Sequence, residues 1–112
     1  MKLAVIGSRN LKIKNLGDYI DGECTEIVSG GAVGIDTCAK NYALERGIKL
    51  TEFLPDYKRY GRGAPLKRNN LIIEYADKVL AFWDGVSRGT KYSIDYAERL
   101  GKQATVILIS AE

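Results

Sequence analysis

The sequence predicts an α/β fold in which about five parallel strands, in the order 3-2-1-4-5, form a sheet with helices on both faces. Short apolar runs alternate along the chain with segments in which apolar residues recur every three or four positions. This alternation is typical of a parallel sheet with right-handed crossovers. The chain has 112 residues, of which 46% are hydrophobic, so it fits one domain spanning residues 1–112.

Five apolar runs account for the strands. The first, residues 3–6, is short and continuously apolar, as expected of a buried strand of a parallel sheet. The other strands are expected at residues 25–28, 49–54, 78–82 and 104–109. Together with the helices between them, these strands predict a three-layer, Rossmann-like sandwich.

Four helices are expected, at residues 16–20, 34–46, 66–75 and 90–100. The apolar stripe of the second consists of Ile35, Cys38, Ala39, Tyr42 and Ala43. Gly47 and Gly101 are expected to end the second and fourth helices. In the third helix, Leu71, Ile72 and Tyr75 are inward candidates. Residues 55–65 show no periodicity, and a loop of that length in a small domain usually has a function.

Composition excludes several classes of function. The net charge of +3 is too small to indicate a nucleic-acid or membrane partner by itself. Cys24 and Cys38 form neither a CxxC pair nor a disulfide framework, so both are expected to be reduced packing residues, as in a cytoplasmic protein. Because the chain starts with strand-like residues, we expect no export leader, and no apolar run reaches the ~20 residues that span a bilayer.

Histidine is absent, which removes Ser-His-Asp and Cys-His catalysis and histidine-based zinc sites. We identify no metal ligands in the sequence and expect no required cofactor. An enzyme with this composition would use carboxylates, hydroxyls, Arg or Lys, or a metal held by oxygen atoms.

The unusual residues follow the strands, at the carboxyl edge of the predicted sheet, where open α/β sheets bind ligands. They are Gly7, Ser8 and Arg9 after the first strand; Ser29, Gly30, Gly31, Gly34 and Asp36 after the second; Asp56 after the third; and Trp83, Asp84, Ser87, Arg88, Gly89 and Thr90 after the fourth. Because purely structural glycines should occur equally at both edges, this concentration predicts one binding site.

A glycine-rich turn between the second strand and the following helix is the first candidate. Gly30, Gly31 and Gly34 would let the backbone approach a phosphate at the helix N-terminus, or would simply allow a tight turn without a ligand. Asp36, one turn into that helix, favours the helix dipole and is also placed to contact a ribose. The spacing matches neither a P-loop nor GxGxxG.

The junction after the fourth strand is the second candidate. Ser87, Gly89 and Thr90 are expected to hold phosphate, or alternatively to cap the helix, with Thr90 at the N-cap. Arg88 either adds charge to the site or is a solvated surface residue. Trp83 either stacks on a base or packs in the core.

Arginine is preferred for phosphate because of its bidentate geometry, so Arg9 and Arg68 are further candidates. Asn69 and Asn70 follow Arg68 at an expected helix start, where they either contact ligand or cap the helix.

These motifs resemble the YspA-type, YpsA-related branch of the SLOG superfamily. The resemblance rests on Gly7-Ser8-Arg9, the segment from Ser29 to Asp36, Tyr60-Gly61, Arg68-Asn69, Ala76-Asp77 and the segment from Ala81 to Thr90. It covers nearly the whole chain. It implies a Rossmann-like domain that binds a nucleotide or a nucleotide-derived small molecule such as an ADP-ribose compound, and that forms a homodimer or higher homo-oligomer.

The same resemblance extends to two related groups. The LOG phosphoribohydrolases, which release a base from nucleoside monophosphates, carry a catalytic glutamate where this chain has Ser93, so hydrolysis would need Asp84 or Asp56 instead. DprA/Smf proteins share the form of the glycine-rich segment. A DprA-like role would bind single-stranded DNA through Arg59, Arg62, Lys67 and Arg68, with Tyr57 and Tyr60 as stacking platforms.

Overall fold

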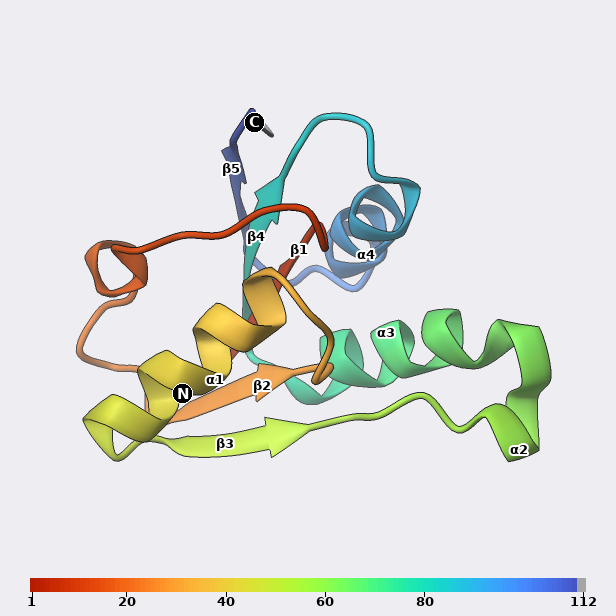
Figure 1. Ribbon diagram of the computed structural model, residues 1–112, viewed down its shortest axis with the longest axis horizontal. Coiled ribbons are helices and arrows are strands. Elements are labelled where there is room, and N and C mark those ends of the chain that lie inside the picture. The colour runs from red at the N-terminus through yellow and green to blue at the C-terminus, as the bar shows by residue number, and fades with distance from the viewer. Residues whose placement is uncertain (111–112) are drawn as a thin grey trace.

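One sheet of five parallel strands forms the centre of the protein, in the predicted order β3-β2-β1-β4-β5. The structure is a computed structural model that describes residues 1–110. Figure 1 shows the strands, which are β1 (Lys2–Gly7), β2 (Glu26–Ser29), β3 (Lys49–Glu52), β4 (Lys78–Trp83) and β5 (Ala104–Leu108).

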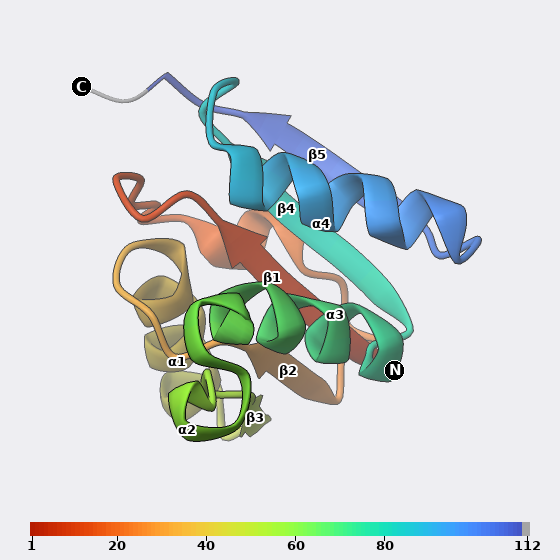
Figure 2. The same ribbon diagram turned by 90° about the vertical axis from the view of Figure 1, so that its right-hand side faces the viewer.

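Helices cover both faces of the sheet and complete an α/β Rossmann-like sandwich. They are η1 (Leu16–Tyr19), α1 (Ile35–Arg46), α2 (Tyr57–Tyr60), η2 (Gly61–Gly63), α3 (Ala64–Tyr75) and α4 (Arg88–Arg99). Figure 2 shows α3 and α4 side by side on one face, with α1 on the other. None of the helices within residues 1–110 is long and apolar enough to cross a membrane.

The apolar side chains form one cluster on each face of the sheet. Val5 and Phe82 lie in the cluster under α1, whereas Ala4 and Ala81 lie in the cluster under α3 and α4. Successive residues of a strand point to opposite faces. The central strands therefore read as continuous apolar runs because both of their faces are covered.

The segment expected to be a loop, residues 55–65, is helical over most of its length, so that prediction was wrong. Asp56 begins α2, and its Oδ1 accepts a hydrogen bond from the backbone N–H of Arg59 at 3.2 Å. Pro65 then lies in the first turn of α3, where backbone N–H groups have no acceptor within the helix, so the N–H that proline lacks is not needed. The apolar pattern gave no sign of α2 because its residues are mostly exposed.

The strand expected at residues 49–54 is two residues too long. Its partner β2 ends at Ser29, which pairs with Glu52, and the chain turns away there. Leu54 consequently lies outside the sheet and is 66% exposed.

The inward face of α3 also differs from the prediction. Leu71 is 39% exposed, because the buried stripe runs through Ala64, Arg68 and Ile72 at four-residue spacing. A stripe that contains a buried arginine is not recognisable from apolar periodicity.

Two predicted capping roles are wrong. The helix α4 begins at Arg88, with Ser87 at the N-cap position and no side-chain capping bond, so Thr90 lies in the first turn and is not the cap. Asn69 and Asn70 lie in the middle of α3 rather than at its start, which excludes a capping role for them.

Candidate functional site

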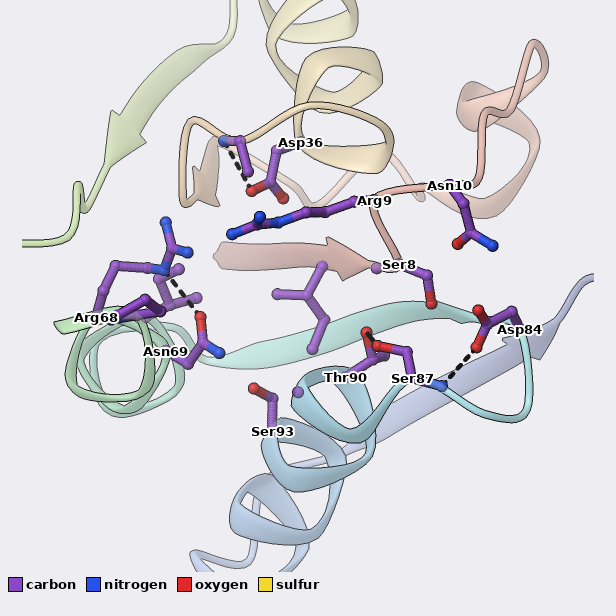
Figure 3. Close-up of a pocket in the computed structure, with 16 residues that line it drawn as sticks. Ser8, Arg9, Asn10, Asp36, Arg68, Asn69, Asp84, Ser87, Thr90 and Ser93 are labelled. Atoms are coloured by element: carbon purple, nitrogen blue, oxygen red, sulfur yellow. Dashed lines mark hydrogen bonds between the residues drawn. The ribbon is translucent and has the colours of Figure 1, made fainter. Parts of the chain in front are cut away.

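A cavity of about 470 Å³ opens at the carboxyl edge of the sheet, and we call it the main cavity. It lies at the ends of β1 and β4, between α3, α4 and the N-terminus of α1 (Figure 3). Its lining consists of Ile6, Gly7, Ser8, Arg9, Asn10, Ala32, Asp36, Pro65, Arg68, Asn69, Ile72, Asp84, Ser87, Gly89, Thr90 and Ser93. The location is the one at which open parallel sheets bind ligands, and the volume lies within the range of small-molecule sites.

A second, smaller cavity of about 260 Å³ adjoins the main one, and we call it the second cavity. Arg9, Ala32 and Arg68 line both cavities. The remaining lining of the second cavity consists of Gly30, Gly31, Val33, Leu54 and Pro55.

The glycines of the turn between β2 and α1 are required by contacts within the protein. A Cβ at Gly30 would lie 2.5 Å from Nη1 of Arg68, and a Cβ at Gly34 would lie 2.5 Å from the carbonyl oxygen of Arg9. Gly31 and Gly34 also have φ angles of 69° and 80°, which L side chains rarely adopt. The glycines of this turn therefore make room for Arg9 and Arg68. Their role is not limited to letting a ligand approach the backbone.

Asp36 and Arg68 are fixed beneath this turn. Oδ2 of Asp36 accepts a hydrogen bond from the backbone N–H of Ala32 at 3.1 Å, and Nη1 of Arg68 donates to the carbonyl oxygen of Gly30 at 2.6 Å. Nε of Arg68 donates to Oδ1 of Asn69 at 2.9 Å. Burial raises the pKa of Asp36 and lowers the pKa of Arg68, because it disfavours the charged form of each.

Arg9 is the exposed cation of the site. Its side chain extends across the main cavity, past Asp36 and toward Arg68 (Figure 3). The two ion pairs within residues 1–110 join Lys49 to Glu26 and Lys91 to Asp95, so Arg9 has no carboxylate partner there. The guanidinium of Arg9 is therefore free to bind an anion.

The first turn of α4 forms the opposite wall. The first backbone hydrogen bond of the helix joins the N–H of Lys91 to the carbonyl oxygen of Ser87 at 3.2 Å. The N–H groups of Arg88, Gly89 and Thr90 come before this bond and therefore have no acceptor within the helix. Such groups and the helix dipole attract negative charge. Oγ of Ser87 donates to Oγ1 of Thr90 at 3.3 Å.

Ser8 lies across from this helix end. Ser8 is 2% exposed and lines the main cavity, and its Oγ makes no hydrogen bond among the described residues, although it lies near the Asp84 carboxylate, whose pKa it helps to lower. Buried hydroxyl groups are normally hydrogen-bonded. The Ser8 hydroxyl is therefore available to a ligand.

Asp84 is ionised at the mouth of the main cavity. Its Oδ1 accepts hydrogen bonds from the backbone N–H of Val86 at 2.9 Å and of Ser87 at 2.8 Å. These bonds stabilise the carboxylate and lower the pKa of Asp84. A carboxylate with a lowered pKa is unsuited to act as a general acid near neutral pH.

The structure brings most of the predicted site residues together. Ten of them line the main cavity, namely Gly7, Ser8, Arg9, Asp36, Arg68, Asn69, Asp84, Ser87, Gly89 and Thr90. Gly30 and Gly31 line the second cavity, whereas Ser29 is fully buried at 0% exposure and lines neither cavity.

Four predicted residues lie elsewhere. Gly34, Trp83, Arg88 and Asp56 line neither cavity. Nε1 of Trp83 donates to the carbonyl oxygen of Ser87 at 3.0 Å, so the ring braces the loop before α4. Arg88 is exposed, and Asp56 caps α2.

Asn10, Pro65 and Ile72 line the main cavity although sequence reasoning did not select them. Pro65 and Ile72 share the face of α3 that carries Arg68. A helix that began at Ala64 would have indicated Pro65, whereas Ile72 was already on the predicted helix, four residues after Arg68.

The residues predicted to bind single-stranded DNA do not all lie on one exposed surface. Arg59, Arg62 and Lys67 are exposed, but Arg68 is buried and faces the cavities, so it does not belong to that surface. The cations of Arg59 and Lys67 lie over the ring of Tyr60, which leaves Tyr57 as the freely exposed ring. Binding of single-stranded DNA stays a prediction.

No family model matches the chain, and no curated protein matches it. Within residues 1–110, no group of three or more His, Cys, Asp or Glu side chains is placed to hold a metal ion. The chemistry of the cavity walls is therefore the basis for a functional proposal.

Proposed function

We propose that this chain is a small cytoplasmic protein that binds a nucleotide or a nucleotide-derived ligand, such as an ADP-ribose compound, in the main cavity. The observation that carries the proposal is the wall formed by the first turn of α4. Its N–H groups precede the first helical bond, and the unpartnered hydroxyl of Ser8 lies across from them. A phosphate supplies the acceptors that these donors need.

Gly89 supports a ligand at this helix end. Glycine in a helix is less favourable than alanine by about 1 kcal/mol, so its presence normally has a local reason. A Cβ at Gly89 would meet nothing within 4 Å, and its φ is not positive, so no contact within the protein explains it. A phosphate group seated against the helix backbone would explain it.

The cations of the site support a ligand with more than one charge. Arg9 and Arg68 lie on the side of the main cavity away from Thr90 (Figure 3). Asp36 lies beside them; burial raises its pKa, and the Ala32 N–H and the charge of Arg68 oppose that shift. The resemblance to SLOG proteins agrees with a nucleotide-type ligand and with a role as a sensor of a nucleotide-derived signal.

Isothermal titration with AMP, ADP-ribose, NAD and a cyclic nucleotide tests this proposal. At least one of them should bind wild-type protein, and Arg9→Gln should weaken that binding by about tenfold or more, since hydrogen bonds to charged groups are worth roughly 1.5–3 kcal/mol. Arg99→Gln, at the far end of α4, removes the same charge and is expected to leave the affinity unchanged. Absence of binding across the panel, or equal losses in the two variants, would contradict the proposal.

Hydrolysis of the bound nucleotide is the second candidate function. Asp36 and Asp84 line the same cavity, and their pKa values are shifted in opposite directions. Such a pair suits one acid and one base. Chromatography for free base after incubation with nucleotides tests this candidate. Turnover that is abolished in Asp84→Asn would support it, and binding without turnover would leave the protein a binding module.

A further inference from the structure

The second cavity continues the main one on the β3 side of Arg9. Arg9, Ala32 and Arg68 line both cavities, so the two cavities adjoin at these residues. A ligand longer than a mononucleotide that reached both cavities would pass beside the two arginines.

The outer part of the second cavity is apolar. Val33 and Leu54 are each 66% exposed, and Pro55 completes the lining beside them. Leu54 lies directly over Gly31, where an added Cβ would come within 2.6 Å of its Cδ2. The glycine thus makes room for a leucine that is held at the surface instead of in the core.

Two guanidinium groups lie at the boundary between the cavities, with the carboxylate of Asp36 beside them (Figure 3). Burial lowers the pKa of Arg68, the Asp36 carboxylate opposes that shift, and the like charge of Arg9 adds to it. Neither arginine is in the ion pairs formed within residues 1–110. Arg68 uses Nη1 and Nε within the protein, and Arg9 uses none of its donors in this way.

We infer that the ligand has two planar ring systems joined through a diphosphate, and that the second cavity holds the second ring. This inference rests on the proposed function. One phosphate end lies against the first turn of α4, the diphosphate continues past Arg9 and Arg68, and the second ring packs on Leu54, Val33 and Pro55. In this arrangement the negatively charged diphosphate meets the two arginines, and the planar ring attached to it meets the neighbouring apolar side chains.

Titration with three adenine nucleotides tests the inference. AMP and ADP supply one ring with one or two phosphates, and diadenosine diphosphate adds the second ring. Diadenosine diphosphate should bind wild-type protein about tenfold more tightly than ADP, because its second ring covers apolar side chains that ADP leaves exposed.

Leu54→Ser should remove that preference and leave the affinity for ADP unchanged. Leu44→Ser is the matched control, because Leu44 is 65% exposed on α1 and lines neither cavity. Val33→Ser should act in the same direction as Leu54→Ser, and circular dichroism checks that each variant is folded.

The outcomes separate the two proposals. Equal affinities of ADP and diadenosine diphosphate for wild-type protein, or an unchanged preference in Leu54→Ser, would overturn the second subsite alone. If none of the three nucleotides binds, the proposed function fails and this inference fails with it.

Discussion

At the scale of single residues, Gly89 is where stability and binding should change in opposite directions. Replacement by Ala adds a methyl group that meets nothing within 4 Å and improves helix propensity. Gly89→Ala is expected to raise the free energy of unfolding by about 0.5–1 kcal/mol and to weaken nucleotide binding at the α4 terminus. Urea denaturation and isothermal titration measure the two effects. A variant that is more stable and binds as well as wild type would contradict the role given to Gly89.

Asp84 should make stability depend on pH in the acid range. Its pKa in the folded protein lies below the ordinary value of 3.8, because the N–H groups of Ser87 and Val86 stabilise its carboxylate. The stabilisation is therefore complete above that ordinary value and is lost as the pH falls through the lower, folded pKa.

Thermal denaturation of wild type and Asp84→Asn at several pH values tests this dependence. Wild type should melt at the higher temperature at neutral pH. The difference should narrow below about pH 4 and vanish once the carboxylate is protonated in the folded state as well. If the two melting temperatures differ by the same amount at every pH, the charge of Asp84 does not contribute to the stability difference.

At the scale of elements, the turn between β2 and α1 is expected to be intolerant of side chains. Gly34 has a φ of 80°, and an added Cβ would lie 2.5 Å from the carbonyl oxygen of Arg9. Gly34→Ala should destabilise the protein by about 1–3 kcal/mol and displace Arg9. Gly63→Ala is the control, because Gly63 has a φ of −79° and open space around its Cα. Urea denaturation that ranks the two variants equally would contradict this account of the turn.

Helices and strands that bury a regular pattern of apolar residues were predictable from the sequence. Elements stabilised in other ways were not. The five strands and α1 were found because their apolar residues face the two clusters. The short helix α2 was missed because it is stabilised by the Asp56 cap and not by an apolar face. The inward position of Arg68 was missed because a charged residue interrupts the stripe of α3.

The candidate site was predictable to a similar degree. Strand order alone places the ends of β1, β2 and β4 together, so Ser8, Asp36 and Thr90 were correctly expected in one region. The second cavity was not predictable, since Leu54 was expected to continue β3. Its exposure depends on where β2 ends, which is a tertiary effect.

At the scale of the whole molecule, one edge of the sheet carries the polar and glycine-rich chemistry. The opposite edge ends in turns, such as the one at Asp77, whose Oδ2 accepts a hydrogen bond from the backbone N–H of Lys2 at 2.8 Å. This asymmetry is expected if one ligand site has shaped the carboxyl edge. The homodimer implied by the SLOG resemblance stays a prediction.

Amide chemical shifts measured by NMR during titration with ADP test the central claim most directly, because they report binding and its location together. The account predicts shifts at Ser8, Arg9, Gly89 and Thr90 at the carboxyl edge. Gly22, Asp77 and Gly101, at the opposite edge, should stay unchanged. No shifts at saturating nucleotide, or shifts confined to the opposite edge, would contradict the account.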